Sequence, residues 1–407
     1  QLRDNRDENM GFLSKTLLPD GTEIPGTNFD YNYLQHRKVD VVSSALDFIL
    51  PFEKYKITAG AKVSFTNTRN GINYDTSDPT LVQDDYFRYK EQIYALYADY
   101  SREYSERFSM QLGLRMEHTR TTGISEAKDT EDKHDYTRLF PTVYLLYSPT
   151  DGHALNFSFS NRISRPSQNM VNPFPFYQNK YTYACGREDL KPSYTYNAEL
   201  GYTLKNNFNV SAYYSYSDDV FFQVVDLDAE TNVTSFLWEN FMKTHAFGLN
   251  NSYTFRTKWL QAYAQHGVSY RRTTSSAVTT SSEEKGWAYD ASLRNTFFFN
   301  EKKTLLATLS GSYSSRQYQG IYLMSPTYSV SAGMLYRLLD NKLNLSLNVN
   351  NLFVSHSKLE TMSNGLKIIA DNQFSFTSFR IGVSYTFGGD IRSKGQRNSN
   401  EDIQRRL

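Results

Sequence analysis

The sequence has few of the features that mark disulfide-linked, helical-membrane or nucleic-acid-binding proteins. Cys185 is the single cysteine among 407 residues, so no internal disulfide can form. No apolar run approaches the roughly 18–20 residues that a membrane-spanning helix needs. The net charge at pH 7 is +1, which gives no reason to expect a nucleic-acid partner. The chain begins at Gln1 without a basic and apolar leader, so we expect any signal peptide to lie upstream.

Signals for catalysis and for metal binding are sparse as well. The residues from Ser355 to Lys358 match S-x-x-K, but the chain has no K-T-G or S-D-N partner motif. The seven histidines are dispersed, without H-x-x-x-H or Cys/His spacing. There is also no glycine-rich phosphate loop. We therefore expect no enzymatic activity, no metal site and no cofactor.

Aromatic residues are abundant, and they favour a β-sheet protein. They make up 15% of the chain, with 32 Tyr and 27 Phe, and such side chains suit a pleated, half-buried surface. Hydrophobic residues reach only 39%, and the mean hydropathy is −0.60. A transmembrane β-barrel has this polar average, because its strands alternate lipid-facing and lumen-facing side chains.

Strict alternation of apolar and polar residues predicts strands over 55–65, 108–117 and 343–350. The second face of these segments is mainly Ser, Thr, Asn, Gln and Gly, which suits a hydrated lumen. In the third segment we expect the leucines to face lipid and the polar residues to face inward. The apolar positions there are Leu343, Leu345, Leu347 and Val349, and the polar ones are Asn344, Ser346, Asn348 and Asn350.

Short polar turns alternate with long polar segments along the chain, as periplasmic turns and extracellular loops do in outer-membrane barrels. The short turns lie near 53–54, 104–106, 151–152, 206–207, 257–258, 300–302 and 340–341. The long segments are 69–86, 122–136, 164–192, 224–241, 272–285, 316–325 and 354–372. The fold predicted is all-β: an antiparallel transmembrane β-barrel of outer-membrane type, with about 14–16 strands.

Strand counting suggests that this barrel is part of a larger one. Seven hairpins and a last strand over 373–387 give about fifteen strands, whereas bacterial single-chain barrels have even numbers. Counting back from the last strand makes 1–37 an extracellular loop or the start of the barrel, before a barrel over 38–387. Residues 388–407 are expected to be a charged periplasmic tail. Alternatively, residues 1–37 contain one further strand, and the resulting sixteen strands close into a complete barrel.

Two groups of side chains are candidates for binding. The 164–192 segment is rich in aromatic residues that could stack on an extracellular ligand or could simply pack the loop over the barrel mouth; these are Phe174, Phe176, Tyr177, Tyr181 and Tyr183. Charged residues on the predicted lumen face could pair with the wall or a plug, or contact a substrate; these are Lys56, Lys62, Arg115, Glu117, Arg162, Glu199, Asp290, Arg294, Arg337 and Arg380.

Several motifs resemble the outer-membrane β-barrel family of Bacteroidota, relatives of TonB-dependent receptors. The most specific are R-I-S-R-P at 162–166, N-P-F at 172–174, G-R-E-D-L-K-P at 186–192 and A-E-L-G-Y at 198–202. The chain departs from the family pattern at Arg187 and Glu188, where Asn-Pro is usual, and at Ser193, where Glu is usual. The resemblance extends from about residue 38 to the end.

This resemblance implies an outer-membrane receptor that takes up a scarce nutrient with energy from the TonB complex. It also implies a plug domain upstream in the same polypeptide, a surrounding outer-membrane lipid bilayer and, in some members, a surface lipoprotein partner. A non-transporting structural or assembly barrel and a passive porin remain alternatives. The ligand does not follow from the resemblance.

Overall fold

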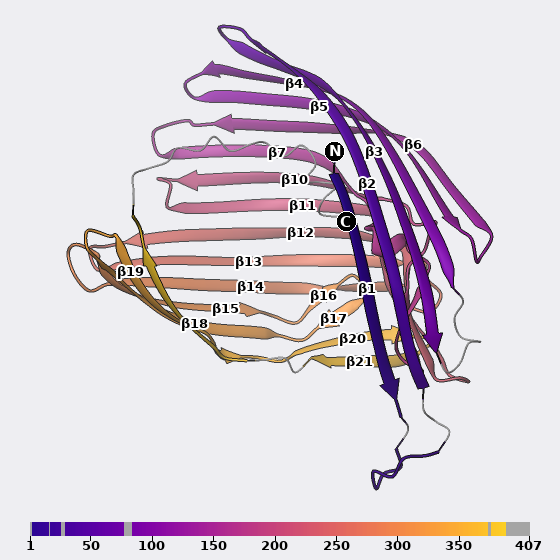
Figure 1. Ribbon diagram of the computed structural model, residues 1–407. Coiled ribbons are helices and arrows are strands. Elements are labelled where there is room, and N and C mark those ends of the chain that lie inside the picture. The colour runs from indigo at the N-terminus through magenta and orange to yellow at the C-terminus, as the bar shows by residue number, and fades with distance from the viewer. Residues whose placement is uncertain (1, 16, 26–28, 77–83, 373–375, 388–407) are drawn as a thin grey trace.

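The computed structural model describes residues 2–15, 17–25, 29–76, 84–372 and 376–387. The main element is one 18-stranded sheet that curves around a concave inner face (Figure 1). Its wall strands pair antiparallel with their neighbours along the chain. Two of the 18 strands, β8 (Pro175–Asn179) and β9 (Thr182–Cys185), belong to the connection between β7 and β10, so 16 strands form the wall.

The wall strands have the following bounds. They are β1 (Leu2–Ser14), β2 (Phe29–Pro51), β3 (Tyr55–Thr76), β4 (Asp85–Ser105), β5 (Phe108–Ser125), β6 (Thr130–Tyr147), β7 (His153–Ser164), β10 (Ser193–Leu204), β11 (Phe208–Asp228), β12 (Val233–Arg256), β13 (Leu260–Ser275), β14 (Glu283–Phe298), β15 (Leu305–Ser314), β18 (Thr327–Leu338), β19 (Leu343–Val354) and β22 (Ser378–Tyr385).

A second, four-stranded sheet lies in the connections at one end of the wall (Figure 1). It consists of β16 (Gln317–Gln319), β17 (Tyr322–Met324), β20 (Ser357–Ser363) and β21 (Leu366–Asn372). The short helix α1 (Gln168–Val171) lies in the connection between β7 and β10. Within the described residues, no helix is long and apolar enough to cross a membrane.

Each of the seven short turns predicted from the sequence joins two successive wall strands. Two of the predicted long loops are wrong, however. Only residues 126–129 separate β5 from β6, and only residues 229–232 separate β11 from β12. In both places the strands continue as a hairpin, because their polar residues still form a regular backbone ladder from Ser125↔Thr130 and from Asp228↔Val233 onwards.

The two faces of the wall differ as the alternation predicted. On β19, Leu345 and Leu347 are 36% and 45% exposed on the outer face, where lipid would cover them. The ladder pairs Ser346 with Gly382 and Asn348 with Arg380, which places these polar residues together on the opposite face. The inner face of β3 is polar and buried, with Ser64 and Thr68 each 3% exposed.

The sheet does not close on itself within the described residues. β22 pairs with β19, and β1 pairs with β2, but no ladder joins β22 to β1. A sixteen-stranded barrel closed by these strands alone is therefore not what the described residues form. β1 lies in the 1–37 segment, which the sequence analysis described as either an extracellular loop or the start of the barrel. The expected start of the barrel at residue 38 falls inside β2. The predicted tail, 388–407, lies outside the described residues.

Candidate functional site: the extracellular mouth and the inner wall

The R-I-S-R-P motif marks the point at which the chain leaves the wall. β7 ends at Ser164, and Pro166 cannot donate a backbone hydrogen bond to continue the ladder. The Arg165 guanidinium reaches the inner face of β5, where its Nη2 contacts Glu117 Oε1 and lies 3.2 Å from Thr119 Oγ1. Its Nε lies 3.9 Å from Glu91 Oε1 on β4. The motif therefore ties the start of the loop to the wall.

The second oxygen of Glu117 is held by Arg115. Arg115 Nη2 and Nε donate to Glu117 Oε2 at 2.6 Å and 2.9 Å. The side chains of Arg165, Glu117 and Glu91 are only 10%, 5% and 4% exposed, so the cluster is shielded from solvent. Two arginines and two glutamates balance in charge. Removing one of them would leave an uncompensated buried charge, which is strongly unfavourable.

The loop from 165 to 192 packs first against β2, β3 and β4. The Tyr31 and Tyr74 hydroxyls both donate to the carbonyl oxygen of Pro175, at 3.0 Å and 3.2 Å. Apolar side chains from these strands and from the loop form one buried cluster. It consists of Phe29, Tyr31, Tyr33, Ile72, Phe87, Val171, Phe174 and Leu190. Burial of this apolar surface stabilises the loop against the wall.

The far end of the same loop is bound to β12. β9 pairs parallel with β12, from Thr182↔Thr234 to Cys185↔Leu237. Beyond it, Arg187 Nη1 donates to Glu239 Oε1 at 2.8 Å, and the Lys191 amide donates to Asn240 Oδ1 at 2.8 Å. Since β2–β4 and β12 are separated in the wall, the loop crosses the barrel mouth between them.

Gly186 is required where two motifs of the loop meet. A Cβ at this position would lie 2.2 Å from the carbonyl oxygen of Asn172 and 2.6 Å from that of Met170. Both atoms belong to the backbone and cannot rotate away. The next amide, that of Arg187, donates to the Met170 carbonyl at 2.8 Å. The N-P-F and G-R-E-D-L-K-P motifs thus fold against each other.

A second buried cluster covers the mouth above β11 and β12. Val224, Val225, Phe241 and Met242 pack against Ile321 and Tyr322 of the connection between β15 and β18. The Tyr322 hydroxyl donates to the Gln223 carbonyl at 2.9 Å. Residues of β20 and β21 pack on the same cluster. Several extracellular connections therefore form one packed layer over this part of the wall.

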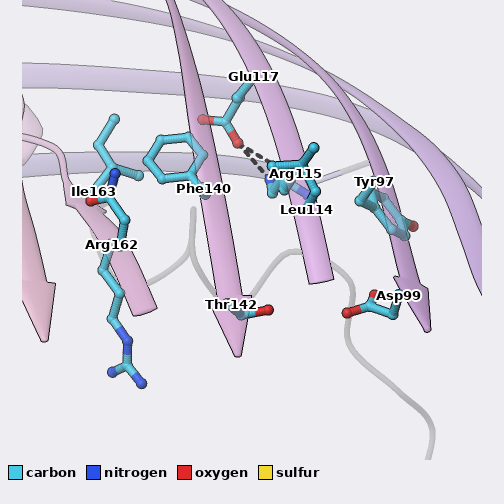
Figure 2. A pocket seen from close by; sticks show the side chains of 10 residues that line it. Tyr97, Asp99, Leu114, Arg115, Glu117, Phe140, Thr142, Arg162 and Ile163 are labelled. Atoms are coloured by element: carbon cyan, nitrogen blue, oxygen red, sulfur yellow. Dashed lines mark hydrogen bonds and ion pairs between the residues drawn. The ribbon is translucent and has the colours of Figure 1, made fainter. Parts of the chain in front are cut away.

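A cavity of about 490 Å³ lies on the inner wall beside the charged cluster (Figure 2). The Arg115–Glu117 pair forms one side of it, and Phe140 lies between this pair and Ile163. The Arg162 side chain extends away from Glu117. The lining residues are Tyr97, Asp99, Leu114, Arg115, Glu117, Phe140, Thr142, Asn161, Arg162 and Ile163. The cavity offers charges of both signs, two side-chain hydroxyl groups and two aromatic rings.

The structure brings together only some of the predicted lumen charges. Arg115, Glu117 and Arg162 line this cavity. The other predicted charges lie on separate parts of the same face, as the ladder register places them. In the ladders, Lys56 lies opposite Ser101, Lys62 opposite Ala95, Glu199 opposite Ser158, Arg294 opposite Ser310, Arg337 opposite Asn344 and Arg380 opposite Asn348. Asp290 accepts a hydrogen bond from Ser314 Oγ at 2.5 Å.

The five predicted aromatic residues have different environments. Phe174 is 1% exposed in the buried cluster, and Phe176 and Tyr177 pack against that cluster. The Tyr183 ring lies 5.2 Å from that of Tyr177. Tyr181 is 48% exposed. Packing thus accounts for most of the group, while Tyr181 has a surface on which a ligand could stack.

Sequence reasoning did not select Arg165 or Glu91 as candidate residues. Arg165 belongs to the R-I-S-R-P motif, and that membership was the available signal. Glu91 faces inward on β4, opposite Thr66 and Thr121, but the alternation around it is weak because Lys90 and Gln92 are also polar. Its burial depends on the loop above it, which no local pattern encodes.

The S-x-x-K residues have structural roles. Ser355 Oγ accepts the Tyr328 amide hydrogen bond at 2.8 Å, and Lys358 Nζ lies 3.2 Å from Asp371 Oδ2. Burial raises the pKa of the Cys185 thiol, whose Sγ lies 3.0 Å from the Pro173 carbonyl oxygen. Among the described residues, no three His, Cys, Asp or Glu side chains gather where they could hold a metal ion.

An antiparallel wall with an apolar outer face, a polar inner face and packed connections at one end is the architecture of an outer-membrane β-barrel, although the described residues leave the sheet open between β22 and β1. The chain belongs to the outer membrane protein beta-barrel family, whose pattern matches residues 2–385. The resemblance to an outer-membrane β-barrel family and the outer-membrane location are thereby confirmed, and the match begins at residue 2 instead of near residue 38. The Bacteroidota origin stays a prediction. No curated protein matches the chain.

Solved structures of receptors and transporters share this fold. The copper transporter OprC aligns with a TM-score of 0.61 at 12% identity, over 94% of this chain and 65% of that one. The ferric citrate transporter FecA aligns at 0.59 and 13% identity, over 94% and 61%. The ferric yersiniabactin uptake receptor FyuA from Yersinia pestis aligns at 0.59 and 16% identity, over 88% and 56%. The chain therefore spans less than two thirds of the length of these proteins.

Proposed function

We propose that this chain is the barrel portion of a TonB-dependent receptor that takes up a scarce nutrient across the outer membrane. A plug domain upstream in the same polypeptide would occupy the inner wall, and a segment before it would contact the TonB complex. A surface lipoprotein would be a further partner. The proposal assigns transport to the chain and no catalytic step.

The observation that carries this proposal is the anchored loop across the mouth. Arg165 and Glu117 fix its start, and β9 fixes its end on β12. A passive porin needs an open, hydrated passage, whereas a mouth spanned by a packed loop offers a surface on which a ligand can bind. The fold shared with siderophore and metal receptors supports the same conclusion.

Within this proposal, the ligand would contact the exposed Tyr181 ring and then the polar inner wall. Aromatic side chains such as Tyr present a large, rigid contact area together with a hydroxyl group. The cavity beside Arg115 and Glu117 would lie on the route below the loop. Its charges of both signs suit a polar ligand better than a hydrocarbon.

The proposal can be tested by deleting the whole gene and growing the strain under limitation for one nutrient at a time. We expect a growth defect on one class of nutrient that the intact gene restores, and short-term accumulation of that nutrient that stops when the proton-motive force is collapsed. Accumulation that continues across the outer membrane after the collapse would indicate passive passage. Normal growth under every limitation, with altered outer-membrane composition, would favour a structural or assembly barrel.

Planar-bilayer conductance of the intact protein separates receptor from porin directly. A receptor whose plug fills the barrel should give no steady conductance, and it should open when denaturant extracts the plug. A steady ohmic conductance without denaturant would exclude the receptor. A barrel with only a structural role would give neither conductance nor a nutrient-dependent growth defect.

A further inference from the structure

Three cationic side chains form one row across the outer face of β2, β3 and β4. The ladder register places Lys38 opposite Arg69 and Arg69 opposite Arg88. These three strands lie side by side in the wall (Figure 1). Directly opposite residues in neighbouring strands have Cβ atoms about 4.5–5.5 Å apart. The three charges are therefore cross-strand neighbours.

The row lies just beyond the apolar band of the same face. The pair Asp40 and Asn67 lies two residues from the row, toward the periplasmic turns. The pair Val42 and Phe65 lies two residues further in the same direction. From there the outer face is mainly apolar, with Val42 and Phe65 50% and 41% exposed, although Gln92 on β4 lies opposite Phe65. The Phe65 ring packs edge-on against Tyr94, with centroids 5.9 Å apart. The cations thus lie at the level of lipid headgroups on the extracellular side.

The protein neutralises this row only in part. Like charges directly opposite each other destabilise a pair of strands. Asp40 is the carboxylate that reaches the row, at 2.8 Å from Arg69 Nη2, but it also holds Arg3 Nε at 2.7 Å. In the described part of the chain, neither Lys38 nor Arg88 forms an ion pair.

Two further details increase the excess of positive charge. Lys90, exposed on the next row of β4, lies opposite Asn67 and adds a cation. Arg69 Nε is shielded from solvent without a hydrogen-bond partner. An anion beside the row would relieve the repulsion between these cations, and the membrane beside it is the nearest source.

We propose that Lys38, Arg69 and Arg88 bind the phosphate headgroup of a lipid in the outer leaflet. Guanidinium groups donate paired hydrogen bonds to phosphate oxygens, and the lysine contributes a further point charge. The acyl chains of the same lipid would lie over Val42 and Phe65. Free phosphate could use the cations but would gain nothing from the apolar surface beneath them. The inference is independent of whether the barrel transports a nutrient.

The opposite part of the wall provides a matched control. There Arg272 lies opposite Lys285, also at the extracellular end of the outer face, above the aromatic pair Tyr270 and Trp287. Both cations, however, bind one carboxylate, because Glu283 accepts from Arg272 Nε at 2.6 Å and from Lys285 Nζ at 2.6 Å. This pair has its own counter-ion and should need a lipid phosphate less.

The test uses the intact protein in detergent and native mass spectrometry. The probes are a diphosphorylated lipid A, the same lipid without its phosphates, and inorganic phosphate. Three variants are compared: K38Q/R69Q/R88Q, the single R88Q as the milder change, and R272Q/K285Q as the control. Heat-modifiable migration in electrophoresis selects the variants that are folded.

We expect the triple variant to bind the phosphorylated lipid about tenfold or more weakly, since hydrogen bonds to charged groups are among the stronger ones. R88Q should show a smaller loss in the same direction, and R272Q/K285Q should stay close to the unmodified protein. If the triple variant does not fold, the affinity of R88Q for the phosphorylated lipid, compared with that of R272Q/K285Q, decides the test.

Three results would overturn the inference. The first is equal binding of the phosphorylated and dephosphorylated lipids. The second is an equal loss in R88Q and R272Q/K285Q. The third is inorganic phosphate binding as tightly as the lipid, which would assign the row to a free anion.

Discussion

Arg165, at the start of the 165–192 loop, contacts Glu117 on the inner face of β5. These residues are 48 positions apart, and their contact converts a strand end into an anchor for an extracellular loop. Arg115 holds the other oxygen of the same carboxylate at 2.6 Å. The buried pair therefore fixes the start of the loop against the wall.

Replacing Arg165 with Met should destabilise the protein by about 3 kcal/mol, because two buried carboxylates would then face one arginine. The free energy of unfolding in lipid bilayers is the measurement. The double variant R165M/E117Q restores charge balance with Arg115 and Glu91. It should therefore be less destabilised than the sum of the two single variants, and strict additivity would argue against a coupled buried cluster.

An arginine at Leu345 should cost about 2–4 kcal/mol of folding free energy if the residue lies near the bilayer midplane. Val63 on β3 should respond in the same way. The matched control is Ser346, the neighbouring residue on the inner face of β19. Reversible folding into bilayers measures all three variants, and an equal loss at Leu345 and Ser346 would show that the assignment of faces is incorrect.

Gly186→Ala should loosen the loop, because the added methyl group would lie 2.2 Å from a backbone oxygen. Limited proteolysis should then cleave within 165–192 faster than in the unmodified protein. Gly71→Ala is the control, since its Cβ would meet only a Tyr86 side-chain atom at 3.6 Å. Unchanged cleavage in Gly186→Ala would mean that the two motifs do not pack as described.

The Cys185 thiol should react slowly with a maleimide at neutral pH. Burial raises the pKa of this thiol, so less of the reactive thiolate is present at any pH below that value. The rate should rise as the pH increases beyond the ordinary range for cysteine. The variant C185S/Y181C places the thiol at an exposed position and should react faster. Equal rates for both proteins would contradict the partly buried position of Cys185.

Tyr181→Ala should weaken ligand binding or uptake once a ligand is known, because this ring is exposed on the loop. Removal of one stacked aromatic contact at a binding surface commonly changes affinity by tenfold or more. The matched control is Tyr328→Phe on the outer wall, which keeps the ring. A similar affinity for all three proteins would leave the loop aromatics with a packing role alone.

The wall could be predicted from the sequence because lipid imposes a regular constraint on it. Leu345 and Ser346 must face different solvents, so polarity alternates and the turns between strands become visible. Beyond the membrane this constraint disappears. The hairpin of β5 and β6 continues through Gly123 and Glu131, where both faces are polar, and the sequence suggested a loop. For the same reason the sequence left open whether the segment that forms β1 is a loop or a strand.

The site was less accessible to sequence analysis than the wall. The alternation of side chains along a strand placed Arg115 and Glu117 on the inner face, because successive residues point to opposite faces of the sheet. It could not pair Glu117 with Arg165, since that contact depends on a turn out of the wall. Likewise, Phe174 and Tyr181 belong to one loop, yet one is 1% and the other 48% exposed. Only long-range packing separates them.

Binding of the intact protein to the periplasmic domain of TonB tests the proposed function most directly and needs no knowledge of the ligand. Isothermal titration calorimetry on the whole polypeptide measures it. The account predicts saturable one-to-one binding that is lost when the segment preceding the plug is deleted. No binding, or binding unchanged by that deletion, would contradict a TonB-dependent receptor and favour a structural barrel or a porin.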